Sequence, residues 1–120
     1  MSKEPVRKSE FHITAEKFAA DLDLEIVYAP EGELCFRSTA TNRPGLLFAG
    51  FDEYFPEHRI QILGNAEMAY LDSLDEEKRD MQLERLFSKG VPCVIVTHKH
   101  RVTDGMAWMA AKYRTALFVS

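Results

Sequence analysis

The stretch that decides the fold is Val91-Pro92-Cys93-Val94-Ile95-Val96-Thr97. Its residues are apolar at consecutive positions, so both alternating faces of an extended strand would be apolar. Such a strand is typical of the middle of a parallel sheet that helices cover on both sides. Because proline cannot donate a hydrogen bond to a neighbouring strand, Pro92 is expected only at the beginning. Residues 91–97 therefore predict a central, fully covered strand.

A helix is expected on each side of this strand. Asp75 can cap the preceding helix, and Gly90 ends it; its buried stripe would be Leu83, Leu86 and Phe87. Thr103 or Asp104 can open the following helix, with Met106, Trp108, Met109, Ala110 and Tyr113 expected in the core. A last apolar strand should cover residues 115–119.

The N-terminal half continues the pattern. Thr14 can cap a short helix, with Ile13 packed on Phe18 and an apolar face continuing to Leu22. Extended stretches are expected at residues 24–28, 34–38 and 59–63, and Asn65 can cap a helix through Met68 and Leu71. Residues 42–45 (Asn-Arg-Pro-Gly) predict a rigid corner, followed by a short helix or by a strand through residues 46–49.

Strands that alternate with helices predict one α/β domain over residues 11–120, after a flexible tail at residues 1–10. The expected architecture is a mostly parallel sheet with helices on its faces and right-handed crossovers. The abrupt end after the last strand suggests a domain from a longer protein.

Bulk properties narrow the function classes. The net charge of −4 argues against nucleic-acid binding, which relies on a basic face. No apolar run approaches the roughly 20 residues that span a bilayer, and no secretion signal is present. We therefore expect a cytoplasmic protein without membrane or nucleic-acid partners, and Cys35 and Cys93 as reduced core residues.

Catalytic motifs are not found in the sequence. Neither GxxxxGK[ST] nor GxGxxG occurs, so we expect no phosphoryl transfer by these 120 residues, no catalytic residues and no cofactor. His98 and His100 could share a metal ion, but a third nearby ligand is missing, and a solvated basic loop is the favoured interpretation. No metal site is predicted.

Two groups of residues are candidate ligand contacts. One is the loop of His98, Lys99, His100 and Arg101, expected at the carboxyl end of its strand, where open α/β sheets bind ligands. The other, treated as a separate site, comprises Asn42, Arg43 and Gly45 at the rigid corner. Solvation of Arg43 and a backbone requirement at Gly45 are the structural alternatives. His58 and Arg59 are expected at the opposite end of the sheet from the basic loop.

Two segments together carry a family resemblance. They are Asn42-Arg43-Pro44-Gly45-Leu46-Leu47-Phe48-Ala49-Gly50-Phe51 and Arg59-Ile60-Gln61-Ile62-Leu63-Gly64, the latter followed by Glu67. In this order they resemble the N-terminal domain of bacterial HPr kinase/phosphorylase, over nearly the whole chain after about Phe11.

The resemblance implies a bifunctional, usually hexameric parent enzyme. That enzyme phosphorylates a serine of HPr, a carrier of the sugar phosphotransferase system, and also removes the phosphate. ATP and magnesium would bind an attached C-terminal kinase domain, which these residues do not include. The resemblance also implies a fold similar to the substrate-binding N-terminal domain of Mur ligases, with a regulatory or architectural role.

Three hypotheses follow. The first is a non-catalytic regulatory domain of this kinase. The second is a stand-alone module that binds a phosphate-like or nucleotide-like anion. The third, ranked last, is an autonomous enzyme of unknown type.

Overall fold

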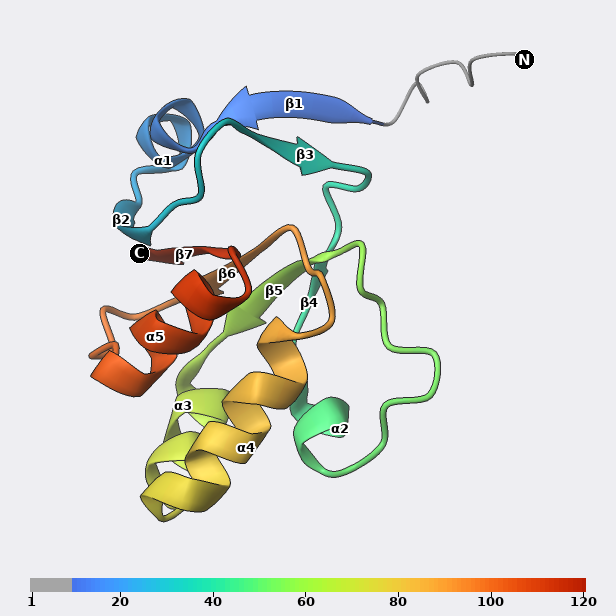
Figure 1. Ribbon diagram of the computed structural model, residues 1–120, viewed down its shortest axis with the longest axis vertical. Coiled ribbons are helices and arrows are strands. Elements are labelled where there is room, and N and C mark those ends of the chain that lie inside the picture. The colour runs from blue at the N-terminus through green and yellow to red at the C-terminus, as the bar shows by residue number, and fades with distance from the viewer. Residues whose placement is uncertain (1–9) are drawn as a thin grey trace.

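The computed structural model describes residues 10–120, which form two sheets and five helices (Figure 1). The larger sheet has the strand order β2-β7-β6-β5-β4. Its strands are β2 (Glu25–Tyr28), β7 (Ala116–Val119), β6 (Cys93–Val96), β5 (Ile60–Leu63) and β4 (Thr41–Asn42). Strands β4, β5, β6 and β7 run parallel, and only β2 is antiparallel to its neighbour. The predicted mostly parallel α/β sheet is confirmed.

Helices cover this sheet on one face, and a smaller layer covers the other (Figure 1). Helices α2 (Gly45–Phe48), α3 (Asn65–Asp72), α4 (Glu76–Phe87) and α5 (Asp104–Lys112) pack against one set of strand side chains. Helix α1 (Ala15–Leu22) packs on the opposite face together with the two-stranded sheet of β1 (Phe11–Thr14) and β3 (Glu33–Phe36).

The central strand β6 shows why this layering arises. Val94 and Val96 belong to the core under α3, α4 and α5, whereas Cys93 and Ile95 belong to the core under α1. All four residues of β6 are buried, as the apolar run predicts. A strand with two covered faces can bury every side chain only in such a three-layer arrangement.

The predicted N-terminal caps of three helices are confirmed. The side chains of Thr14, Asp75 and Thr103 each accept a hydrogen bond from the backbone N–H three residues later. The short helix expected after Pro44 is also present as α2. The prediction for Asn65 is wrong: it is the first residue of α3, and Gly64 is the cap.

Three predictions of core residues are also wrong. Leu22, Trp108 and Cys35 are exposed. Leu22 ends α1 beyond its buried face, and Trp108 stacks near the Lys112 ammonium instead of entering the core. Cys35 lies on the outer face of β3, which no other part of residues 10–120 covers. Of the predicted flexible tail, residues 1–9 lie outside the described residues.

Within residues 10–120, no helix is both long and apolar enough to cross a membrane.

Candidate functional site

Four parallel strands end at one edge of the larger sheet, which we call the carboxyl edge. Asn42 ends β4, and Arg43 follows it; Leu63 ends β5, and Gly64 follows it. The loop of residues 98–101 follows β6 by way of Thr97. Because parallel strands end on the same side, both groups of predicted contact residues lie on the carboxyl edge, with the start of α3 between them.

We call Arg43, Gly64 and Glu67 the Arg43 corner. The Arg43 guanidinium donates from Nε (3.1 Å) and Nη2 (2.8 Å) to Oε1 of Glu67. The same oxygen accepts the backbone N–H of Gly64 at 2.8 Å. Glu67 therefore joins the end of β5 to the residue after β4. It also satisfies an N–H at the start of α3 that would otherwise lack an intrahelical partner.

Glu67 is a buried carboxylate, only 8% exposed. Burial alone would raise its pKa, but hydrogen bonds from Arg43 and from the Gly64 N–H outweigh burial, so the net pKa is lowered. The carboxylate is thus held ionised by its partners. The Arg43 side chain remains 56% exposed, so water solvates part of the ion pair.

Gly64 is a glycine because of crowding rather than backbone conformation. A Cβ atom at this position would lie 2.8 Å from Arg43 Nη2 and 3.3 Å from Glu67 Oε1. Its φ of −94° is open to any residue. The absence of a side chain at residue 64 is what lets the guanidinium lie against the start of α3.

Asn42 is also occupied by a contact inside the protein. Its Nδ2 donates to Oε1 of the fully buried Gln61 at 2.9 Å. Gln61 Nε2 in turn donates to the carbonyl oxygens of Pro56 (3.1 Å) and Arg59 (2.9 Å). The buried amide is therefore satisfied on both sides, which fixes the loop before β5.

Gly45 has different surroundings. A Cβ atom there would meet nothing within 4 Å, and its φ is not in the left-handed region. The backbone requirement considered for this glycine is therefore not what the structure shows. Gly45 lines a shallow 230 Å³ hollow, whose other lining residues are Phe48, Ala49, Ala66, Glu67 and Tyr70.

The basic loop, residues 98–101, is turned towards solvent. His98 and Lys99 adopt left-handed backbone conformations, with φ of 60° and 54°. The Lys99 N–H donates to the Ser120 carbonyl at 3.1 Å, and His98 Nδ1 lies 2.9 Å from Thr97 Oγ1. Residues 98, 99 and 101 are exposed, as a solvated loop requires.

One contact connects the basic loop to the helix that begins at the Arg43 corner. His100 Nε2 lies 2.6 Å from Oδ1 of Asn65, the residue directly after Gly64. The sequence predicts the basic loop and the residues around Arg43 as separate sites. The structure places them on either side of the first turn of α3.

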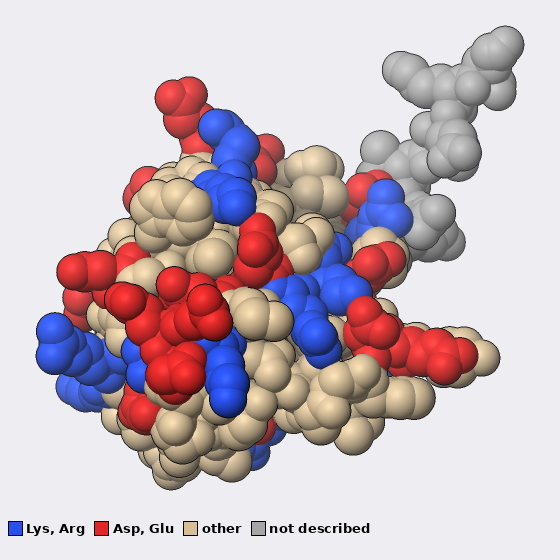
Figure 2. All heavy atoms as spheres, turned by 60° about the horizontal axis from the view of Figure 1, so that its bottom comes forward, with Lys and Arg blue, Asp and Glu red and all other residues tan. Residues whose placement is uncertain are grey.

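A hollow of about 710 Å³ opens beside the basic loop. Lys99 and His100 line it, but so do the carboxylates of Asp23, Glu25 and Asp104. Figure 2, in which the lower end of Figure 1 is turned forward, also shows acidic and basic side chains interspersed on the surface. An anion in the hollow would meet both attractive and repulsive charges.

His58 and Arg59 precede β5 at its amino end. They therefore lie at the edge opposite the basic loop, as predicted from parallel pairing of β5 and β6.

The residues that sequence reasoning missed are Gln61 and Glu67 as internal partners of the predicted contact residues. Both stand in the segment quoted for the family resemblance, which was the one available signal.

This architecture defines the class of protein: a small α/β domain with a mostly parallel sheet. A solved structure with the same fold contains the CBS and DRTGG domains of the regulatory region of a Clostridium perfringens pyrophosphatase, complexed with an activator, diadenosine tetraphosphate. The TM-score is 0.61 at 17% identity, over 89% of this chain and 40% of that one, so the similarity shows the fold alone.

The chain belongs to the family described as HPr Serine kinase N terminus, whose model matches residues 13–120. HPr kinase/phosphorylase of Alkaliphilus metalliredigens is 38% identical over 109 residues, covering 90% of this chain and 35% of the relative. The protein of the same name from Caldicellulosiruptor bescii is 37% identical over 109 residues, with 89% and 35% covered. The chain thus spans about a third of the length of the curated relatives it matches.

Proposed function

We propose that this chain is the non-catalytic N-terminal domain of an HPr kinase/phosphorylase, with a regulatory or architectural role in that enzyme. The observation that carries the proposal is the family match over residues 13–120, together with relatives of that name that are about three times as long. The parent enzyme would phosphorylate and dephosphorylate a serine of HPr in the cytoplasm, with ATP and magnesium in its kinase domain.

The geometry of the carboxyl edge supports a structural role for the residues of the two segments that carry the family resemblance. Arg43, Gly64 and Glu67 contact one another, and Asn42 contacts Gln61. These hydrogen bonds join the end of β4 to β5 and to the start of α3, and the hollow that Asn42 and Arg43 line is small, at about 80 Å³. A site for ATP would need groups that cradle a triphosphate and its metal ion, and the sequence has no glycine-rich loop for that purpose.

The pyrophosphatase structure with a similar fold comes from the regulatory region of that enzyme, which supports a regulatory role for the present domain. The proposed partners are an attached kinase domain, further copies of the protein and HPr itself. A regulatory domain would act by changing the activity or the assembly of the attached catalytic part.

The first test is the mass of the native polypeptide in cell extract. We expect a chain that continues past residue 120 into a domain with a GxxxxGK[ST] loop. A native protein that ends at Ser120 would rule out the attached kinase. In the longer protein, deletion of residues 11–120 should change oligomeric state, or the regulation of HPr phosphorylation and dephosphorylation. Unchanged behaviour in all these assays would refute the proposal.

A second candidate function is binding of a phosphate-containing small molecule at the carboxyl edge. The 710 Å³ hollow beside Lys99 and His100 favours it, and the similar pyrophosphatase region was solved with diadenosine tetraphosphate. A ligand that binds only the folded state raises the unfolding temperature. We would therefore screen nucleotides, diadenosine tetraphosphate and phosphosugars by thermal unfolding.

The screen has matched variants. Lys99→Ala and Arg101→Ala should reduce any ligand-dependent shift, whereas Lys17→Ala, on α1 away from the hollow, should not. Asn42, Arg43 and Gly45 are the alternative contacts, and Arg43→Ala distinguishes them from the basic loop. If no compound shifts the unfolding temperature, the binding function is rejected while the regulatory one stands.

A further inference from the structure

Among residues 10–120, the small sheet of β1 and β3 is covered on one face and open on the other. Phe36 and Leu34 point into the core under α1, whereas Cys35 and His12 lie on the exposed face. His12 and Cys35 are direct partners across the two strands. Side chains of directly opposite residues stand on the same face, and so does the side chain two residues away along the strand. Glu10 therefore joins His12 and Cys35 on the open face.

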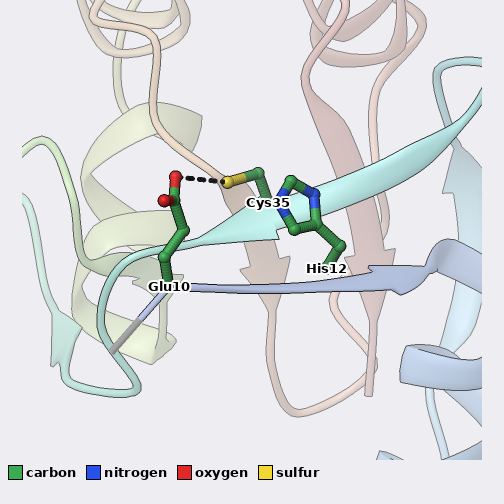
Figure 3. A group of neighbouring side chains, drawn as sticks. All are labelled: Glu10, His12 and Cys35. Atoms are coloured by element: carbon green, nitrogen blue, oxygen red, sulfur yellow. Dashed lines mark hydrogen bonds between the residues drawn. The ribbon is translucent and has the colours of Figure 1, made fainter. Parts of the chain in front are cut away.

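The three side chains converge (Figure 3). The Cys35 thiol donates to Glu10 Oε2 at 3.3 Å. One donor atom from each of Glu10, His12 and Cys35 lies within 4.8 Å of the other two. A carboxylate, an imidazole and a thiol thus meet at one point on the surface, supplied by β1, by the residue directly before it and by β3.

We propose that Glu10, His12 and Cys35 form a binding site for a divalent transition-metal ion of the zinc type. Zinc takes thiolate, imidazole and carboxylate ligands in tetrahedral geometry, and a site with three protein ligands leaves the fourth position to water. Hard ions such as magnesium prefer oxygen ligands only, so this mixed set selects against them. The proposal concerns a surface remote from the carboxyl edge and does not depend on the proposed function.

The observed spacing is close to what the metal needs. Bond lengths of about 2.0 to 2.3 Å in a tetrahedron place the donor atoms about 3.5 Å apart. The three donor atoms must therefore approach one another by at most about 1.3 Å from their 4.8 Å limit. Cys35 and His12 are exposed, so their side chains can rotate without disturbing the core.

Binding must replace the thiol proton. The reaction is Cys–SH + Zn²⁺ → Cys–S–Zn⁺ + H⁺, with the proton released to solvent. The proton that the metal displaces is the one that the Cys35 thiol donates to Glu10 Oε2. The other thiol cannot take this role, because Cys93 is buried in the sheet and burial raises its pKa to about 12.

Within the described part of the chain, the Arg37 guanidinium opposes the cation. Arg37 Nε lies 3.9 Å from Glu10 Oε2. Arg37 also lines a 250 Å³ hollow with Cys35 and His58. The guanidinium must turn away from Glu10 when the metal binds, and its removal should therefore tighten binding. Arg37→Gln is a variant whose effect has the opposite sign from that of every ligand variant.

The test is a titration of the untagged 120-residue chain with Co²⁺, which shows visible absorption and a thiolate charge-transfer band when tetrahedral ligands include sulfur. We expect one equivalent of Co²⁺ to bind, and Zn²⁺ to displace it. Cys35→Ser should abolish the charge-transfer band. His12→Gln and Glu10→Gln should each weaken Co²⁺ binding at least about tenfold, whereas Arg37→Gln should strengthen it severalfold.

The matched control is the double variant His98→Gln/His100→Gln, which removes the two neighbouring histidines of the basic loop and should leave the titration unchanged. Circular dichroism and thermal unfolding check that each surface variant is folded. Cys35→His should retain Co²⁺ binding without the charge-transfer band. A thiolate band that persists in Cys35→Ser would overturn the proposal, as would loss of binding in the histidine double variant or no band in the unaltered chain with excess Co²⁺.

Discussion

The Arg43 corner and the basic loop occupy the same edge of the sheet, yet their charges are used in different ways. Arg43 donates two hydrogen bonds to the buried Glu67 carboxylate, which also accepts the Gly64 N–H. In the basic loop, Lys99 and Arg101 are exposed, and each is free of ion pairs among the described residues. A charge that has a buried partner contributes to stability, whereas a solvated one is available to a ligand.

Loss of the buried partner should have the largest effect. Glu67→Ala leaves the Gly64 N–H unsatisfied and Arg43 without its carboxylate. We expect a loss of about 2 to 3 kcal/mol in the free energy of unfolding, below the value for a fully buried pair because Arg43 is half-exposed. Urea unfolding measures it, with Glu57→Ala on an exposed loop as the control. A loss equal to that of the control would show that the corner is not structural.

Acid should also affect the Arg43 corner, because the contribution of Glu67 to the free energy of unfolding depends on pH. The pKa of Glu67 is lowered in the folded state, so its contribution is fully present above its unfolded value and is lost as the pH falls through the lowered folded value. Unfolding free energy should therefore fall below about pH 4.5 in the unaltered chain. The fall should be shallower in Glu67→Gln, which cannot titrate. Parallel pH profiles for the two proteins would contradict this assignment.

Crowding at Gly64 should have a smaller effect. The new Cβ of Gly64→Ala would displace the end of the flexible Arg43 side chain, so we expect a loss of about 1 to 2 kcal/mol. In an Arg43→Ala background, where no guanidinium is displaced, the same change should cost much less. A double-mutant cycle measures this coupling directly. Equal costs in both backgrounds would show that crowding by Arg43 is not the reason for the glycine.

Substitutions in the basic loop should have the smallest effect on stability. Lys99→Ala and Arg101→Ala remove exposed side chains, and we expect changes within about 0.5 kcal/mol. Their effect should be seen only in ligand-dependent thermal shifts. If either variant is destabilised as much as Glu67→Ala, the comparison between the two regions fails.

Features that depend on neighbouring residues could be predicted from the sequence. The helix caps at Thr14, Asp75 and Thr103 involve a contact three residues away, and the apolar run of β6 is visible within a single strand. The parallel sheet then follows from the alternation of strands and helices. Asn65 failed as a cap because α3 begins one residue earlier than expected, with Gly64 as its cap, and the Asn65 side chain contacts the distant His100 instead.

Features that depend on distant residues could not be predicted. The partners Arg43 and Glu67 are 24 positions apart, and the chain order of β4 and β5 does not reveal their contact. Strand β1 is defined by its pairing with β3, whose residues lie 19 to 25 positions later. Helical periodicity likewise shows which residues share a helix face with Trp108 or Leu22. It does not show which helix faces pack against the rest of the protein. The same limit hid the meeting of Glu10, His12 and Cys35.

The position of β7 has a consequence for how the protein is made. The last strand, Ala116–Val119, lies inside the sheet between β2 and β6 rather than at an edge. During synthesis β2 emerges early, but its partner β7 becomes available only after residues 116–119 have left the ribosome. The sheet cannot close before residues 116–119 are made, and until then the apolar strand β6 has one unpaired hydrogen-bonding edge. A nascent chain that stalls before residue 116 would therefore leave this edge of an apolar strand open to pairing with another chain.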